Sequence, residues 1–292
     1  MKHFKHLILL LCCILVNSIC FATPEYFQYD QRVFDKAVLP FTFSKKLPVV
    51  IVKIQGKKFH LIVDTGAPNV TVALKPSVLR DINVKYLESK SHSLDIHGQS
   101  YEEKEYEIPK LTIGKLKLVN LIAREELRTF VPADGIIGNR LLKEFYLLFD
   151  YKELKLTFFP KGNYPLELNL EQWKKVHFEY DDYDKRVGII LTAQIPELKR
   201  ELKLCLDSGS SAFDNGKPCG TLLAKYMPEL PKEVRAVEYN QVMIDGLALG
   251  PTSFRVSDYQ EPPIDGFMGF SFFNNYKVFV DFDQKVLFVK KY

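Results

Sequence analysis

The sequence predicts an all-β fold with a few short helices, in which two homologous, barrel-like lobes hold a functional site between them. Three observations support this prediction. Apolar runs of strand length recur along the whole chain, three short motifs occur twice in the same order, and a turn-forming segment with Pro and Gly, 160–165, separates the two copies. The chain has 292 residues, 47% of them hydrophobic, which is enough to bury one large core or two smaller ones.

Residues 1–22 have the pattern of a secretory signal peptide. Two lysines precede an apolar run from Leu7 to Val16, and the small residues up to Ala22 fit a cleavage site. The run is shorter than the roughly 20 apolar residues of a membrane span. We therefore expect export, without stable membrane insertion after cleavage; an uncleaved anchor is the alternative. A lipoprotein at Cys20 is disfavoured because bulky Ile19 precedes it.

Charge and cysteine content narrow the class of protein further. The formal net charge is +4, or +2 without Lys2 and Lys5, which is too weak to indicate a nucleic acid partner.

Beyond the signal segment only two cysteines remain, Cys205 and Cys219. In an oxidising compartment they could pair as a disulfide, although Cys205 also lies in an apolar run and could equally be a buried hydrophobic residue. The compact lobes and the lack of a multiple-disulfide framework suggest a bacterial protein in the periplasm or outside the cell.

The repeated motifs identify the candidate site. An apolar run ends in Asp64-Thr65-Gly66 in the first copy and in Asp207-Ser208-Gly209 in the second. Each triplet is followed by an Asp-Gly-apolar-apolar-Gly block, at 134–138 and 265–269, and then by an apolar run containing Asp150 or Asp281. The last two motifs are each repeated 131 residues later, whereas the triplets are 143 residues apart. The sequence therefore predicts a duplicated domain, with a first lobe at 23–160 and a second at 161–292.

The strand and helix signals follow the motifs in order. For the first copy we expect a hairpin, a second hairpin, a short helix and two strands, at 49–63, 111–118, 139–145, 148–151 and 154–159. For the second copy we expect two strands, a short helix, a hairpin and two closing strands, at 187–193, 202–206, 220–226, 243–249, 279–282 and 286–289. Segment 26–43 could add a strand to a sheet between the lobes, and Trp173 is expected to pack at the lobe boundary.

Together the two triplets and their downstream Gly blocks resemble the signature of the pepsin and retropepsin families of aspartic peptidases. The resemblance covers residues 47–292; two lobes in one chain are similar to pepsin, while Asp-Thr-Gly-Ala in the first lobe is closer to the retroviral form. It implies a bilobal acid-protease fold, Asp64 and Asp207 as the catalytic pair, an extended polypeptide as substrate, a monomer, and no cofactor or metal.

The chemistry of peptide hydrolysis explains these residue types. One carboxylate deprotonates a water molecule while the other carboxyl protonates the carbonyl oxygen. Two close carboxylates cannot both ionise readily, so they share a proton and titrate as a pair. Gly66 and Gly209 allow tight turns beside them. Thr65 and Ser208 resemble residues whose hydroxyls lock the two loops together, and we expect a slightly looser lock on the Ser208 side, which lacks a methyl group.

The resemblance also implies a hairpin flap that extends from the first lobe over the cleft. Segment 94–101, with a turn centred on Gly98, is the candidate, and Tyr101 could correspond to a tyrosine that orients substrate. The alternative is an ordinary surface hairpin with a half-buried Tyr101, because the distance from Asp64 does not fix the register. We interpret Asp134 and Asp265 as structural turn residues.

Several other functions lack the motifs that they require. The histidines have no metal-ligand spacing, and neither a Gly-x-Ser-x-Gly nucleophile elbow nor a phosphate-binding glycine loop is present. The sequence therefore favours an aspartic endopeptidase. A catalytically silent peptide-binding protein on the same scaffold is the alternative, because segment 210–219 of the second copy is more polar than its first-copy counterpart. The sequence does not separate a narrow processing enzyme from a broad digestive one.

Overall fold

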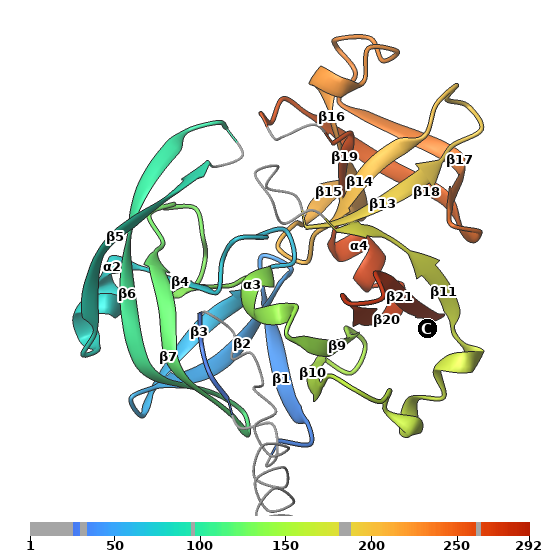
Figure 1. The fold of residues 1–292 in the computed structure, drawn as a ribbon. Helices are drawn as coiled ribbons and strands as arrows, with labels where there is room; N and C mark the ends of the chain where they lie inside the picture. The colour runs from blue at the N-terminus through green and yellow to red at the C-terminus, as the bar shows by residue number, and fades with distance from the viewer. Residues whose placement is uncertain (1–25, 30–33, 95–96, 181–187, 261–263) are drawn as a thin grey trace, which may run out of the picture.

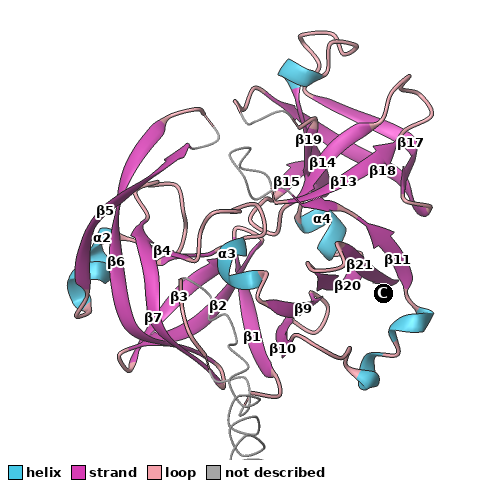
Figure 2. Ribbon diagram, viewed as in Figure 1, coloured by secondary structure: helices cyan, strands magenta, loops and turns pink. Residues whose placement is uncertain are grey.

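Two β-rich lobes and a sheet that joins them make up the protein (Figure 1). The computed structural model describes residues 26–29, 34–94, 97–180, 188–260 and 264–292, so the expected signal segment lies outside the described residues. Helices are few and short (Figure 2), and within the described ranges none is long and apolar enough to cross a membrane. The predicted all-β class with short helices is confirmed.

The first lobe is a closed, strongly curved sheet. Its strands lie in the order β2 (Leu47–Ile54), β3 (Lys57–Val63), β8 (Gly135–Ile137), β4 (Val72–Leu74), β7 (Leu116–Glu125), β6 (Ser100–Ile113) and β5 (Lys85–Leu94). Pairing of β2 with β6 closes the lobe. The helices α2 (Pro76–Asp81) and α3 (Asn139–Leu142) are short connections. Buried apolar side chains of β2 help to fill the core of this lobe. Strand β3 ends at the junction with the other lobe.

The second lobe repeats this arrangement. Its strands lie in the order β12 (Glu179–Tyr180), β13 (Ile189–Gln194), β14 (Leu202–Leu206), β19 (Gly266–Met268), β16 (Lys217–Leu223), β18 (Leu247–Ser257) and β17 (Ala236–Ile244), with β15 (Ala212–Asp214) paired to β16. Pairing of β13 with β17 closes the lobe. In each lobe the strand that leads to the Asp triplet runs parallel to the strand of the Asp-Gly block, β3 beside β8 and β14 beside β19.

The predicted helix at 220–226 is wrong. The chain continues as strand β16 as far as Leu223, and only Ala224–Tyr226 form a 3₁₀ turn. The segment pairs on one side with β18 and on the other with β19, so its backbone hydrogen bonds and its buried side chains are both satisfied by the sheet. This tertiary environment outweighs the local helix signal.

A six-stranded sheet joins the lobes. Its order is β11 (Lys174–His177), β21 (Val286–Lys291), β20 (Tyr276–Asp281), β9 (Phe145–Asp150), β10 (Lys155–Pro160) and β1 (Ala37–Ser44), with three strands from each half. The halves meet where β20 pairs antiparallel with β9, centred on Leu148 and Phe279. Trp173, only 9% exposed, lies in a buried cluster with aromatic residues of both halves, as expected for the lobe boundary. β1 is the expected additional strand.

Of the two alternatives for Cys205 and Cys219, the disulfide is not formed. Cys205 on β14 and Cys219 on β16 are buried and are not joined. Strand β19 lies between β14 and β16, so the two cysteines are separated by two strand spacings, about 9.5 Å, which exceeds the roughly 7 Å that a disulfide can span between Cα atoms. Both side chains fill the core of the second lobe, which is the alternative that the apolar run around Cys205 suggested.

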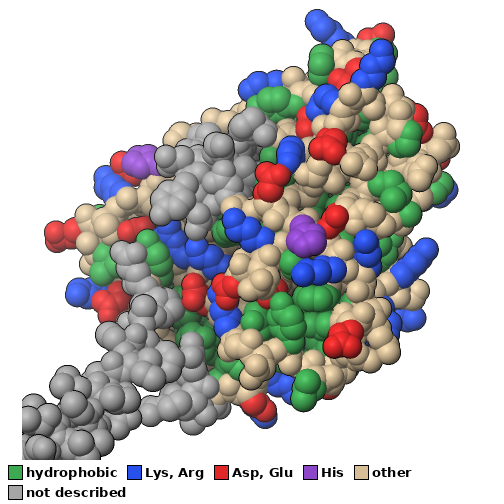
Figure 3. Space-filling model, turned by 45° about the vertical axis from the view of Figure 1, so that its right-hand side comes forward, with side chains coloured by type: hydrophobic (Ala, Val, Ile, Leu, Met, Phe, Trp, Pro, Cys, Tyr) green, Lys and Arg blue, Asp and Glu red, His purple; other side chains and the backbone are tan. Residues whose placement is uncertain are grey.

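The surface has a mixed charge. On the face shown in Figure 3, basic and acidic side chains are interspersed, and apolar side chains lie between them. This pattern matches the small formal net charge of +4. The mixed charges indicate that this face is an ordinary solvated surface and not a strongly basic patch.

Candidate active site

Each Asp triplet forms a tight loop at the end of a buried strand. Asp64 follows β3 and its N–H donates to Ile137 O at 2.9 Å; Asp207 follows β14 and its N–H donates to Met268 O at 2.8 Å. Within each loop the glycine N–H donates to the carboxylate two residues earlier, at 2.8 Å for Gly66 and 2.7 Å for Gly209. The two copies of the motif therefore fold locally in the same way.

Four reciprocal hydrogen bonds join the two loops across the lobes. The Thr65 N–H donates to Ser208 Oγ at 3.0 Å, and the Ser208 N–H donates to Thr65 Oγ1 at 2.9 Å. The Thr65 hydroxyl donates to Leu206 O at 2.8 Å, and the Ser208 hydroxyl donates to Val63 O at 2.7 Å. Both hydroxyl residues are buried. The distances on the two sides agree, so the expected looser lock at Ser208 is not observed.

The glycines hold the two carboxyl groups together. A Cβ placed on Gly66 would lie 2.4 Å from Asp207 Cγ, and one placed on Gly209 would lie 2.5 Å from Asp64 Cγ. These separations are far below van der Waals contact, so each carboxyl group rests directly on the glycine of the opposite loop. The carboxyl groups of Asp64 and Asp207 are hydrogen-bonded to each other. The lock thus brings together the two acidic residues that the sequence singled out.

The environment of Asp64 favours a retained proton. Removal from water raises the pKa of the Asp64 carboxyl above its usual value, while the hydrogen bond from Asp207, the positive charge of Arg128 and the Gly66 N–H oppose this shift. A hydrogen bond between two carboxyl groups requires that one of them carries the proton. The pair is therefore suited to have one acid and one base at the same time.

The Asp-Gly blocks support the loops from behind. Asp134 accepts the His60 N–H at 2.8 Å, and Asp265 accepts the Lys203 N–H at 2.7 Å, so both are turn residues. A Cβ on Gly138 would lie 2.5 Å from Val70 O, and one on Gly269 would lie 2.1 Å from Ser210 O. Neither position has room for a side chain, because the loop after each Asp packs directly onto it.

One supporting residue was missed by the sequence analysis. Asn139, fully buried at the start of α3, donates from its side-chain amide to Thr65 O. Gly188 of the second lobe packs on the same spot, where an added Cβ would lie 2.3 Å from Thr65 O. The second copy has Phe270 at the position of Asn139. The sequence could have indicated a role for Asn139, because the two copies differ at this position, directly after the repeated block.

The predicted flap segment forms the tip of a hairpin. Strands β5 and β6 pair antiparallel, and the turn between them contains Gly98 at a φ of +79°. A Cβ on Gly98 would lie 3.3 Å from Gln260 Cβ, and the ring of His97 meets the ring of Tyr259 edge-on at 5.8 Å. The hairpin of the first lobe thus reaches the second lobe. Half-buried Tyr101 lies near its tip, opposite Ser93. Residues 95 and 96 lie outside the described residues.

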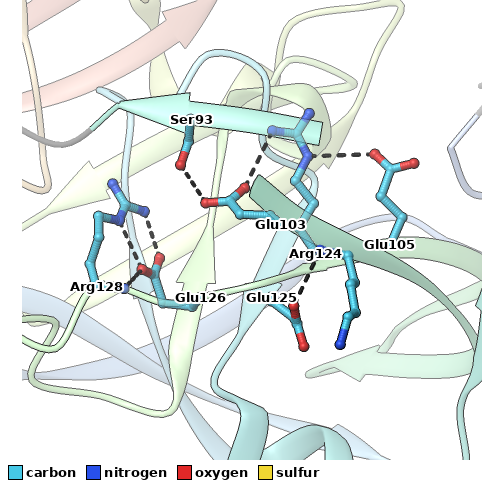
Figure 4. A network of polar contacts seen from close by, with 8 residues as sticks. Ser93, Glu103, Glu105, Arg124, Glu125, Glu126 and Arg128 are labelled. Carbon is cyan, nitrogen blue, oxygen red and sulfur yellow. Dashed lines mark hydrogen bonds and ion pairs between the residues drawn. The ribbon is translucent and has the colours of Figure 1, made fainter. Parts of the chain in front are cut away.

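A network of charged side chains lies beside this hairpin (Figure 4). Arg124 on β7 is 3.9 Å from Glu103 and 3.8 Å from Glu105, both on β6. The Ser93 hydroxyl donates to Glu103. In the loop after β7, Arg128 binds Glu126 through three hydrogen bonds, at 2.5–2.9 Å. No motif predicted this network, because Arg124 meets Glu103 and Glu105 only where β6 pairs with β7.

The fold and the paired carboxyl groups define the architecture of a two-lobed aspartic proteinase. Residues 50–141 match a family model described as "Aspartyl protease". No curated protein matches the sequence. Among solved structures, an aspartic proteinase from Irpex lacteus is similar with a TM-score of 0.57 and 12% identity, over 88% of this chain and 97% of that one. This likeness concerns the fold; with the family match, it confirms the resemblance to pepsin- and retropepsin-type aspartic peptidases.

Proposed function

We propose that the protein is an aspartic endopeptidase that hydrolyses peptide bonds with Asp64 and Asp207. The observation that carries this proposal is the symmetric lock at Thr65 and Ser208, which holds two carboxyl groups in hydrogen-bond contact at the junction of the lobes. Like-charged groups are placed this close where a shared proton is useful, because their repulsion otherwise destabilises the fold.

The proposed reaction uses both protonation states of the pair. The ionised carboxylate takes a proton from a water molecule, and the resulting hydroxide attacks the carbonyl carbon of the peptide. The protonated carboxyl group donates its proton to the carbonyl oxygen, which gives a neutral tetrahedral diol. The carboxyl group that took the proton from water then passes it to the amide nitrogen, while the other, now ionised, carboxylate takes a proton from a diol hydroxyl. The C–N bond breaks, and the products are a carboxylic acid and an amine. An extended substrate would lie beneath the β5–β6 hairpin and hydrogen-bond to it.

A catalytically silent peptide-binding protein is the second candidate. The observation that favours it is a polar hairpin in the second loop, where β15 and β16 are joined by a turn at Asn215 and Gly216, both with positive φ. Ser211, just before this hairpin, donates to Lys45 O of the first lobe at 2.8 Å. The first copy has no such hairpin between Gly66 and β4 in the described structure. It would add a binding surface without adding a catalytic group.

The decisive test is cleavage of a pool of denatured peptides between pH 3 and pH 7. We expect the wild type to cleave, and Asp64→Asn and Asp207→Asn each to reduce the rate by roughly 10²- to 10⁴-fold or more. Pepstatin should block the wild-type activity, and Asp81→Asn, at an exposed position, should leave it unchanged. A folded wild type that captures peptides but cleaves none at any pH would establish the binding protein instead.

We also propose that the protein acts outside the cytoplasm, in the periplasm or beyond, and as a monomer, because one chain supplies both loops of the site. The support is the lysine-flanked apolar pattern of residues 1–22. Fractionation of cells that express the full chain should find it, shortened by about this segment, outside the cytoplasm. Full-length protein in the cytoplasm would contradict the proposal.

A further inference from the structure

The face of the first lobe next to the β5–β6 hairpin is unusually polar for a small sheet. Ser93, Glu103, Glu105 and Arg124 gather there, and Glu103 and Arg124 are buried. Removing such charges from water costs free energy unless they are well paired. The Arg124 contacts of 3.8 and 3.9 Å are longer than good hydrogen bonds, so these pairs compensate only part of that cost. A functional reason for the polarity is therefore worth seeking.

Arg128 is the member of the network that can meet another molecule. Its Nε and Nη2 donate to Glu126 at 2.8 and 2.5 Å, which fixes the guanidinium in place. The Glu126 side chain is fully buried, whereas that of Arg128 remains 18% exposed. Within the described part of the chain, no residue accepts a hydrogen bond from Arg128 Nη1. One edge of a rigidly held guanidinium is thus available to a ligand.

Arg128 also lies in the electrostatic neighbourhood of the dyad. Burial raises the pKa of Asp64; the hydrogen bond from Asp207 opposes this shift most strongly, and the positive charge of Arg128 opposes it next. Arg128 follows β7, whose partner β6 continues to the hairpin tip that meets the second lobe. Because Arg124 pairs with Glu105 near the start of β6, Arg128 lies at the end of the first lobe from which the hairpin reaches the second lobe. The second copy has Tyr259 at the corresponding position, six residues before its Asp-Gly block, so the positive charge belongs to one side only.

We propose that Arg128 is a specificity-determining residue that binds an acidic side chain of the substrate near the scissile bond. A planar guanidinium binds a carboxylate with good geometry, and the fixed orientation imposed by Glu126 reduces the entropy lost on binding. Glu126 is fully buried and cannot contact a basic side chain of the substrate, so the guanidinium of Arg128 is the exposed group of this ion pair. This inference rests on the proposed function only for the position of the scissile bond.

The test compares peptides that differ only by Glu or Gln at one position, scanned over the residues on both sides of the cleaved bond. We expect wild type to prefer Glu at one position by about tenfold in kcat/KM. The double variant Glu126→Gln with Arg128→Gln removes both charges together, which avoids leaving a buried charge unpaired. It should lose the preference, whereas Lys36→Gln with Glu167→Gln, at an exposed ion pair of 3.0 Å on a remote surface, should keep it.

A binding measurement separates this inference from the proposed function. Fluorescence anisotropy of the same labelled peptides with the full-length Asp207→Asn variant needs no turnover. Tighter binding of the Glu peptide, lost on adding the two Gln substitutions, supports the inference even if wild type cleaves nothing and the proposed function fails. Equal affinity for both peptides, binding of neither, or a preference that survives in the double variant overturns it.

Discussion

At the scale of single residues, the site depends on acidic groups that are partly withdrawn from water and on glycines that let them approach. Asp64 and Asp207 each accept a hydrogen bond from their own loop, while the opposite glycine forms the floor beneath them. Both features follow from a motif of three residues. The carboxyl pair should therefore control how the stability of the protein depends on pH. The two glycines should control the distance between the two carboxyl groups.

Replacing Asp64 by Asn should stabilise the protein at neutral pH. Burial raises the folded-state pKa of Asp64 above the ordinary value near 3.8, so the stability linked to its proton is complete below that pH and is lost as the pH rises through the folded-state pKa. Asn carries no charge at any pH and avoids this loss. Thermal unfolding should show Asp64→Asn above wild type in Tm at pH 7, with the gap shrinking toward pH 3.5. A gap in Tm that does not change with pH would contradict the assignment.

Adding one methyl group at either active-site glycine should abolish activity without unfolding the chain. A Cβ at Gly66 would lie 2.4 Å from Asp207 Cγ, and a Cβ at Gly209 would lie 2.5 Å from Asp64 Cγ. Either methyl group would therefore displace the opposite carboxyl group. We expect Gly66→Ala and Gly209→Ala to lower kcat/KM by about 100-fold or more, as for other misplacements of about 1 Å. Circular dichroism should show a retained fold.

A control glycine outside the site separates crowding from backbone strain. Gly216, at the tip of the β15–β16 hairpin, has a φ of +78° and open space around it. Gly216→Asn, which tolerates this φ, should leave activity unchanged. If the two Ala variants at the active-site glycines remain as active as this control, the close approach of the carboxyl groups is not required.

At the scale of elements, the lock between the loops should be a large local contribution to stability. Ser208→Ala removes the acceptor for the Thr65 N–H and the donor to Val63 O, and leaves two buried backbone groups unpaired. We expect a loss of about 2–4 kcal/mol in the free energy of unfolding, measured in urea. Ser211→Ala loses one exposed hydrogen bond, to Lys45 O, and should cost less than about 0.5 kcal/mol. Equal losses in the two variants would show that the loops are held by other contacts.

The strands, the lobes and the acidic pair were predictable from the sequence, because apolar runs and duplicated motifs are local signals. The helix at 220–226 was mispredicted because β18 and β19 supply pairing partners from distant parts of the chain. The contacts of Arg124 in the charged network were not predictable for the same reason. Glu103 and Arg124 are far apart in sequence and meet only because β6 and β7 pair in a particular register. Asn139 had a weak signal, as the residue at which the two copies differ.

At the scale of the whole molecule, the joining sheet should make the two lobes unfold together. Trp173, the only tryptophan, belongs to a buried cluster that includes Tyr146, Leu148 and Phe159 of the first half and Phe279 of the second. Its fluorescence therefore reports the junction, while circular dichroism reports the strands of both lobes. We expect the two probes to give the same urea midpoint, as in a two-state transition. A circular dichroism transition that precedes the fluorescence change would show that a lobe unfolds before the junction opens.

The pairing of β9 with β20 has a consequence for how the two halves can differ. Leu148 faces Phe279, its own counterpart in the other copy, and the neighbouring pairs are exchanged symmetrically about this point. The junction therefore has the register of an isologous dimer whose subunits have been linked into one chain. In a dimer of identical subunits, every substitution appears on both sides of the axis. Linkage removes that constraint, so one half can carry Arg128 and Asn139 while the other carries Tyr259, Phe270 and an additional hairpin. A symmetric pair of carboxyl groups can therefore lie in asymmetric surroundings.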